Sequence, residues 1–139
     1  MAYPRLHIIV LLTIVCSTQY SVAMDMNDTA LATHQQELRR GTVVIAVLAL
    51  LRKPGYGYAL IEALNGTGVA VDANTLYPLL RRLEKQGLLT SDWDTEGGRP
   101  RKYLRTSPNG ERVLGALITE WNHLDASLKG ILKGGSGDE

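Results

Sequence analysis

The sequence predicts a mainly helical fold of the α+β class. Apolar residues recur at helical spacing over most of the chain, two short stretches alternate with a period of two, and one apolar seam repeats every seven residues. At 139 residues with 45% hydrophobic content, the chain can bury one ordinary core. The single cysteine, Cys16, excludes an internal disulfide, and the three histidines have no metal-ligand spacing.

Residues 1–26 depart from this pattern, and we interpret them as a leader outside the fold. A short apolar run, residues 8–16, is followed by small residues at 21–23 that resemble a cleavage site. The run is shorter than the roughly 20 apolar residues that span a bilayer. Three alternatives stay open: a start codon assigned too early, with Met24 or Met26 as the true first residue, a weak secretory signal, and a hydrophobic arm of the fold. We favour the early start, because nothing after Met24 resembles an exported protein.

Residues 27–106 are predicted to form one domain that begins with helices. Residues 29–40 contain mostly good helix formers, and the apolar stretch at residues 43–51 predicts a buried core helix. Lys53-Pro54-Gly55 should end that helix, and a short helix is expected from Gly57 to Leu64. Gly66 should then close this helix in the left-handed conformation.

The next helix, ANTLYPLLRRLEKQG from residue 73, divides into two faces. Asp72 is positioned to cap its first turn. Its core stripe is predicted to consist of Leu76, Leu79, Leu80 and Leu83. The outer face then carries Asn74, Thr75, Pro78, Arg81, Arg82 and Lys85, with Tyr77 at its margin. This face is either the solvated side of an ordinary helix or a surface that reads nucleic acid.

Two alternating runs after this helix predict a β-hairpin. Residues 89–94 and 101–106 each alternate with a period of two, and a Gly-Gly-Arg-Pro tip joins them. The glycines permit the turn, Pro100 stiffens it, and Arg99, Arg101 and Lys102 are expected to project from it. A helix-turn-helix followed by a basic hairpin is the layout of a winged helix with a two-stranded β wing. In that layout the outer helix face can enter the major groove, while the hairpin tip lies along a phosphate backbone or reaches the adjacent minor groove.

Three motifs, in this order and spacing, carry a specific resemblance. GTVVIAVLALLRKPGYGYALIEAL, NTLYPLLRRLEKQGLLTSDW and GRPRKYLRTSPNGERVL resemble the PadR family of bacterial transcriptional regulators, in its subfamily with a short C-terminal helix, over roughly residues 38–133. The resemblance implies a winged-helix repressor that binds DNA as a dimer, and in some members releases DNA on binding small aromatic molecules such as phenolic acids. The family's motif positions fall on Gly57, Tyr58, Tyr77, Arg81, Arg82, Gly98, Arg99, Pro100, Arg101 and Lys102. The apolar leader is not part of the family's pattern.

Residues 107–133 are predicted to form a long C-terminal dimerisation helix, with Ser107 as its cap and Pro108 in its first position. Its heptad seam consists of Leu114, Leu117, Trp121, Leu124, Leu128 and Ile131. The seam pairs either with a second copy or with its own domain, and the length of the helix favours the second copy. Trp121 offers a slot for a planar aromatic or phenolic effector, although plain packing is the simpler interpretation. Residues 134–139 read as a flexible tail.

The functional prediction is a sequence-specific DNA-binding transcriptional regulator. We expect a homodimeric repressor on an inverted-repeat operator, with base reading by Asn74, Thr75, Tyr77 and Arg81 and phosphate contacts by Lys85, Arg99, Arg101 and Lys102. Arg82 is assigned to the same DNA-binding surface. Repression follows from the resemblance alone, and activation stays open.

Other function classes fit the sequence less well. No nucleophile, base and metal set points to an enzyme, and no cofactor is expected. A winged helix that binds only proteins is the serious alternative, because fold does not fix function. A regulator tethered through residues 6–16 is a weaker one. We expect a cytoplasmic protein without stable membrane association.

Overall fold

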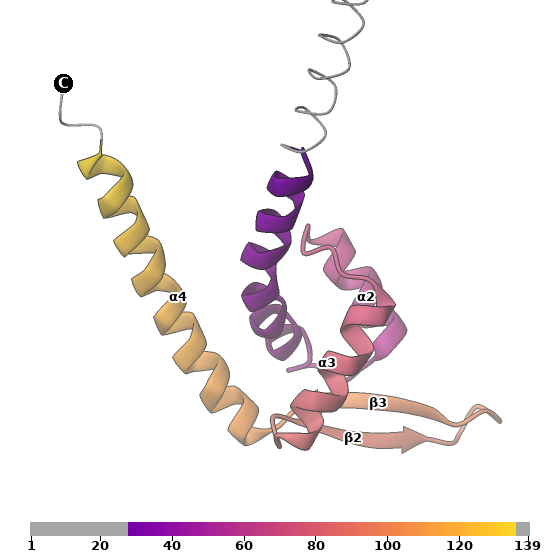
Figure 1. The fold of residues 1–139 in the computed structure, drawn as a ribbon. Coiled ribbons are helices and arrows are strands. Elements are labelled where there is room, and N and C mark those ends of the chain that lie inside the picture. Colours follow the sequence, from indigo (N-terminus) through magenta and orange to yellow (C-terminus); the bar gives the residue numbers. More distant parts are fainter. Residues whose placement is uncertain (1–27, 136–139) are drawn as a thin grey trace, which may run out of the picture. The chain divides into compact units, whose positions relative to one another are not determined.

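The computed structural model describes residues 28–135, which fall into two units: residues up to Arg40, and residues from Gly41 onward. The predicted leader, residues 1–26, lies outside the described residues. The second unit contains β1 (Gly55–Tyr56), α2 (Gly57–Gly66), α3 (Ala73–Lys85), β2 (Leu89–Asp94), β3 (Arg101–Thr106) and α4 (Pro108–Gly134), as Figure 1 shows. Residues 41–50 precede β1 and are helical. The predicted α+β class is confirmed.

The described part of the first unit is a single helical stretch, residues 28–40. Every side chain in it is exposed, including Leu31 and Leu38. An ion pair between Arg40 and Glu37, 3.4 Å apart, lies one turn along the helix. Helix formation here agrees with the prediction, and packing does not account for it.

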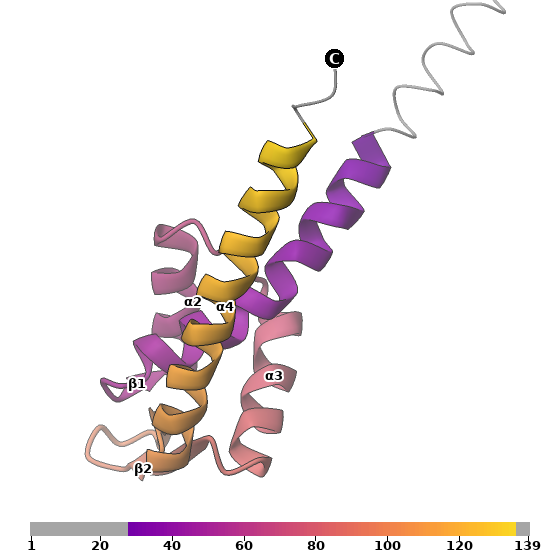
Figure 2. The same ribbon diagram turned by 90° about the vertical axis from the view of Figure 1, so that its left-hand side faces the viewer.

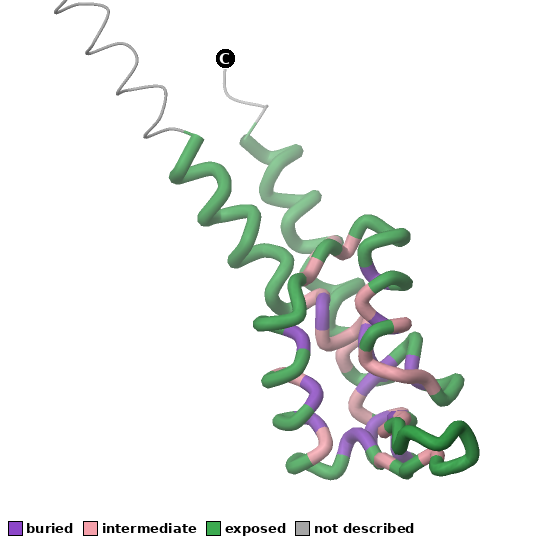
Figure 3. The backbone as a smooth tube through the Cα atoms, turned by 90° about the vertical axis from the view of Figure 1, so that its right-hand side faces the viewer, coloured by how far each residue is buried: buried purple, intermediate pink, exposed green. Residues whose placement is uncertain are grey.

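The core of the second unit is built almost entirely from leucine and valine. Helix 41–50 contributes Val43, Val47 and Leu48, and the following Leu51 is also buried. These side chains pack with Leu60, Leu64, Leu76, Leu80, Leu83, Leu88, Leu89, Leu104 and Leu114. Figure 3 shows these buried positions in purple along the tube. Apolar burial of this kind stabilises the unit by about 25 cal/mol per Å² removed from water.

The α3 helix forms where its sequence predicts it. The Asp72 side chain accepts a hydrogen bond from the backbone N–H of Thr75 at 2.8 Å, which caps the first turn. Leu76, Leu80 and Leu83 are buried. At the end of α2 one expectation is wrong: Gly66 is still helical, and the left-handed residue is Gly68, with φ of 84°.

The sheet has three antiparallel strands in the order β1-β3-β2. The wing pairs β2 with β3 in the register Leu89 to Thr106 through Asp94 to Arg101. Gly98, with φ of 71°, supplies the left-handed residue at the wing tip. The additional strand β1 was not predicted, because two residues carry no readable alternation.

The start of α4 is fixed to the rest of the unit by polar contacts. The Ser107 hydroxyl accepts from the N–H of Gly110 at 3.0 Å and donates to the carbonyl of Gly87 at 2.6 Å. Nearby, Arg52 and Glu111 form an ion pair at 2.9 Å, which raises the pKa of Arg52. Figure 2 shows α4 starting beside the strands and running away from them.

The burial along α4 corrects the predicted dimer seam at its N-terminal end. Leu114 is fully buried in the core of its own chain, and Leu117 packs partly against that core. Leu114 therefore has no surface left for a partner. From Ile118 onward the apolar side chains are exposed, so a seam between copies would start about one turn later.

No helix within residues 28–135 combines the length and the apolar character needed to cross a membrane.

Candidate nucleic-acid interface

The outer face of α3 carries exposed polar and basic side chains. Asn74, Tyr77, Arg81, Arg82 and Lys85 are all exposed. None of the three cations forms an ion pair with another described residue. This face therefore offers positive charge and hydrogen-bond donors that the described part of the chain does not use.

Thr75 differs from its neighbours on this face. Its backbone N–H donates to one oxygen of Asp72, and its hydroxyl donates to the other oxygen at 3.2 Å. The hydroxyl proton is committed to the helix cap, so Thr75 has acceptor capacity left for a base but no donor.

The three predicted wing cations take two different roles. Arg99 and Arg101 are exposed, as expected. Lys102 is half-buried, and its ammonium group lies 2.8 Å from a carboxylate oxygen of Glu84 on α3. The expectation that Lys102 projects freely from the wing is therefore wrong, because its ammonium group is paired with Glu84.

Glu84 is the residue that joins the wing to α3. One of its carboxylate oxygens accepts from Lys102 on β3, and the other accepts from the Ser91 hydroxyl on β2. The hydrogen bond from Lys102, followed by that from Ser91, lowers the pKa of Glu84. Both strands of the wing thus form hydrogen bonds with one side chain of α3.

A second contact fixes the outer part of the wing. The Tyr56 hydroxyl on β1 donates to Asp94 at 2.7 Å, and the N–H of Glu96 donates to the same carboxylate at 3.1 Å. These donors lower the pKa of Asp94, and the hydrogen bond to Asp94 raises the pKa of Tyr56. Asp94 also lies opposite Arg101 in the strand register.

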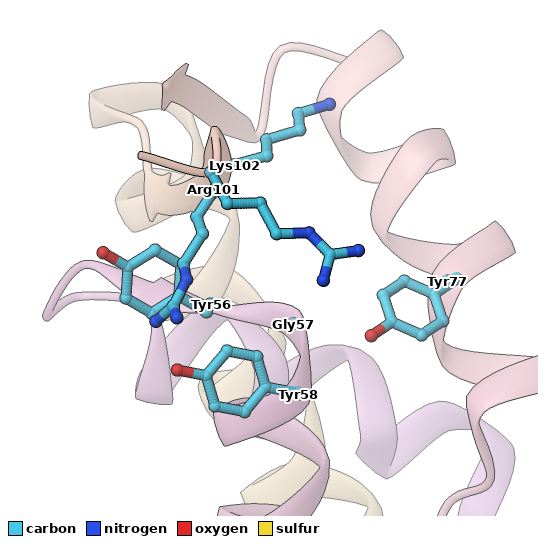
Figure 4. Close-up of a pocket in the computed structure, with 7 residues that line it drawn as sticks. Tyr56, Gly57, Tyr58, Tyr77, Arg101 and Lys102 are labelled. Atoms are coloured by element: carbon cyan, nitrogen blue, oxygen red, sulfur yellow. The ribbon is translucent and has the colours of Figure 1, made fainter. Parts of the chain in front are cut away.

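Tyrosines gather where α2, α3 and the wing meet. The rings of Tyr56 and Tyr58 stack with centroids 5.7 Å apart and planes 7° apart, and Tyr103 meets Tyr56 edge-on. Tyr77 faces this group from α3, as Figure 4 shows. A Cβ atom at Gly57 would lie 2.7 Å from the Tyr77 ring, so only glycine leaves this ring where it is.

Two hollows adjoin this junction. One of about 380 Å³ is lined by Tyr56, Gly57, Tyr58, Tyr77, Arg99, Arg101 and Lys102. The other, of about 330 Å³, is lined by Gly57, Tyr77, Leu80, Arg81, Glu84, Lys102 and Leu104. Tyr77 lines both, so α3 and the wing border one surface, on which four of the lining residues are cations: Arg81, Arg99, Arg101 and Lys102.

The family of transcriptional regulators described as PadR-like matches residues 47–116, which is half of the chain. This protein belongs to the PadR-like family. The matched segment covers α2, α3, the whole wing and the start of α4. The family is one of transcriptional regulators rather than of enzymes, and its winged-helix fold agrees with the three-stranded sheet and helices found here.

Individual relatives agree with this assignment. A PadR-family transcriptional regulator from Eggerthella lenta is 50% identical, with a TM-score of 0.72 over 76% of this chain and 94% of that one. A PadR-like transcription factor from Bacteroides fragilis is 34% identical, with a TM-score of 0.60 over 71% and 98% of the two chains. The transcriptional regulator Rv3488 of Mycobacterium tuberculosis is 41% identical over 59 residues, which are 42% of this chain and 55% of that protein. The match therefore spans about half the length of that curated relative.

The sequence located the basic surface but missed the side chains that organise it. Tyr56 and Glu84 were not predicted to have a role. Asp94, an acid on the first wing strand, was expected to orient or balance the wing arginines, and it pairs across the strands with Arg101. Glu84 gives no such signal, since its contact with Lys102 joins two elements 18 residues apart in the sequence.

Proposed function

We propose that this PadR-family regulator is a homodimeric repressor that binds double-stranded DNA through α3 and the wing. The observation that carries the proposal is the shared surface: side chains of α3 and of the wing line the same hollows. Three of the lining cations, Arg81, Arg99 and Arg101, have no ion pair among the described residues. A protein-binding winged helix would have no use for basic groups on both elements. The fold class places such a helix in the major groove and such a wing along the backbone.

Within this surface we assign two kinds of contact. Asn74, Tyr77 and Arg81 on the exposed face of α3 would read base edges, with Thr75 as an acceptor only. Lys85, Arg82, Arg99 and Arg101 would contact phosphates, which supply most of the affinity. Lys102 would instead position the wing through Glu84.

The exposed part of α4 supports the homodimer. Its apolar side chains with open surface are Ile118, Trp121, Leu124, Leu128, Ile131 and Leu132. An exposed apolar stripe of this length is typical of an interaction face. Two-fold pairing would present two recognition helices to half-sites about one helical turn apart, and thus to an inverted repeat.

Trp121 is our candidate for an effector site. It is 46% exposed within one chain, and a planar aromatic or phenolic molecule could stack on it at the dimer seam. The chain has a second tryptophan, Trp93, which is also exposed on the wing. A Trp93→Phe variant leaves Trp121 as the sole tryptophan, so that quenching by a panel of planar aromatics reports on α4 alone. No quenching across the panel would argue against the effector site.

The central test measures salt-dependent DNA binding by the full chain. Operator sequences would be selected from random duplexes, and the binding constant measured by fluorescence anisotropy over a range of salt concentrations. In the double variant Arg99→Ala/Arg101→Ala the slope of log K against log salt should fall by about 1.8 per subunit, since each phosphate contact contributes about 0.9.

Arg112→Ala removes an exposed cation from α4 and serves as the matched control, with an unchanged slope. Selected sequences without an inverted repeat would contradict the proposal that the protein binds DNA as a symmetric dimer. Binding that non-specific competitor abolishes for every duplex would favour the protein-binding alternative.

A further inference from the structure

We propose that the larger hollow between α2, α3 and the wing, the tyrosine hollow, binds a purine nucleoside monophosphate that competes with DNA. Its lining combines the two chemistries that a nucleotide needs, guanidinium groups for a phosphate and phenol rings for a base. The inference rests on the proposed function, because the competing ligand is the DNA itself. Nucleotide units reach such a site from two sources, a free nucleotide or the DNA strand, and the experiment separates them.

The phosphate end is set by the two exposed arginines. Lys102 is paired with Glu84, which leaves Arg99 and Arg101 as the lining cations without an ion pair among the described residues. Asp94 lies opposite Arg101 in the register, but its carboxylate already accepts from Tyr56 and from the N–H of Glu96. The lining of the hollow has three cations and no acid. Counting Glu84, which pairs with Lys102, and Asp94, which lies opposite Arg101, the balance is three positive charges to two negative, so an anion is favoured. Two guanidinium forks suit a phosphate better than a single charge of an ammonium would.

The aromatic end is set by parallel rings. Tyr56 and Tyr58 stack nearly parallel, and Tyr77 faces them across the hollow. Tyr58 is 53% exposed and Tyr77 is 43% exposed, so ring surface is open to a ligand. Neither the Tyr58 hydroxyl nor the Tyr77 hydroxyl has a hydrogen-bond partner among the residues that the structure describes. A planar base stacked here would gain both ring contact and donors at its edge.

The volume agrees with a ligand of this size. At about 380 Å³ the hollow lies at the lower end of the range of about 300–1,000 Å³ that small-molecule sites occupy. Its position decides the consequence of binding. Tyr77, Arg99 and Arg101 also belong to the proposed DNA surface, so a bound nucleotide and DNA would exclude each other.

Titration calorimetry on the full chain provides the direct test, with adenosine 5′-monophosphate as the probe. We expect a dissociation constant of about 1 mM or tighter. Adenosine, which lacks the phosphate, and ribose 5-phosphate, which lacks the base, should each bind at least about tenfold more weakly. Equal binding of adenosine and its monophosphate would overturn the phosphate site, and no heat at about 10 mM probe would overturn the inference as a whole.

Variants locate the ligand. Arg101→Ala and Tyr58→Ala should each weaken binding of the monophosphate about tenfold, whereas Tyr58→Phe, which keeps the ring and loses only the hydroxyl, should weaken it less. Arg105→Ala is the matched control, because Arg105 is an exposed arginine on the same strand that does not line the hollow. Unchanged binding in Arg101→Ala and Tyr58→Ala would overturn the site.

A competition experiment separates this inference from the proposed function. Adding the monophosphate should shift the DNA binding curve of the wild type to higher protein concentration, and should do so much less for Tyr58→Ala. One outcome would overturn the inference and leave the proposed function standing: the protein binds DNA but not the nucleotide, and Tyr58→Ala weakens the DNA complex. The hollow would then contact the DNA strand itself. If neither ligand binds, both fail.

Discussion

Two regions differ in whether contacts within one chain satisfy their side chains. The first is the wing together with α3, and the second is the distal part of α4. At the wing, polar side chains satisfy one another: Lys102 and Ser91 bind Glu84, and Tyr56 binds Asp94. Along α4 beyond Leu117, the apolar side chains are exposed in the part of the chain that the structure describes. The first region has a geometry that a single chain fixes, and we expect its variants to change DNA affinity. The second is the proposed dimer interface, and we expect its variants to change association.

Substitution at the start of α4 should have the largest effect on stability. This part of α4 packs against its own domain, and with the wing and α3 it forms the region that one chain completes, here called the self-completed region. A Cβ atom at Gly110 would lie 2.2 Å from the carbonyl oxygen of Leu88, which already accepts the N–H of Ser107. Gly110→Ala should therefore destabilise the domain by about 2–3 kcal/mol in urea unfolding.

Gly115→Ala is the control for this substitution. A Cβ atom there meets nothing within 4 Å, so the same change one turn later should stabilise the helix by about 0.5–1 kcal/mol. Equal free energies of unfolding for the two variants would contradict the close contact at Gly110.

The distal part of α4 should show the next largest effect. The double variant Leu124→Lys/Leu128→Lys places two charges on the exposed apolar stripe, and should weaken dimerisation at least about 100-fold. Sedimentation velocity over a range of protein concentrations measures this change. Because both leucines are about half exposed in one chain, the monomer should keep its helical circular dichroism.

Thr119→Lys/Ala126→Lys adds the same charge to exposed positions on the opposite face of α4, and should leave the dimer intact. A dimer that survives the leucine substitutions, or one that both double variants disrupt equally, would show that the stripe is not the interface.

The sequence was sufficient for most of the fold, because the deciding signals are local. Asp72 and Ser107 cap the helices that their positions predict, and the alternation at residues 89–94 and 101–106 predicts both wing strands. The heptad repeat on α4 is equally clear, yet it assigned Leu114 to a contact with a second copy, whereas Leu114 packs in the core of its own chain. Periodicity reports which face of a helix is apolar, and it cannot report whether the same chain or another one covers that face.

The candidate site was predicted by charge and missed in its internal contacts. Arg99 and Arg101 are exposed as expected, at a tip whose glycines and proline carry no long side chains. Lys102 was assigned the same role, although its alternate position on the strand turns it toward Glu84. Contacts between elements distant in sequence depend on tertiary geometry, which residue spacing alone does not contain.

A substitution that disturbs the packing of Tyr77 on Gly57 should have a smaller effect, on DNA affinity rather than on association. The added methyl group of Gly57→Ala would displace the Tyr77 ring from a 2.7 Å contact, and should weaken operator binding about tenfold without unfolding the domain. Gly66→Ala, in the same helix with open space around its Cβ, should bind as the wild type does.

A mutant cycle in the same binding assay identifies the cause. If Gly57→Ala acts through the ring, combining it with Tyr77→Ala should lower affinity no further than Tyr77→Ala alone. Additive losses would mean that Gly57 acts by some route other than Tyr77.

The ion pair between Glu84 and Lys102 should show the smallest effect, and pH reveals it. Contacts with Lys102 and Ser91 lower the pKa of Glu84, so the stability that the pair contributes is present above the unfolded-state pKa and is lost as pH falls through the lowered folded-state value. Because the Lys102 side chain is 38% exposed, solvent screening limits this contribution to about 1 kcal/mol. Glu84→Gln should therefore lose less stability than the wild type on going from about pH 6 to about pH 3. Glu62→Gln, an exposed control on α2, should follow the wild-type curve in chemical unfolding. Parallel curves for all three proteins would show that the pair does not hold the wing to the recognition helix.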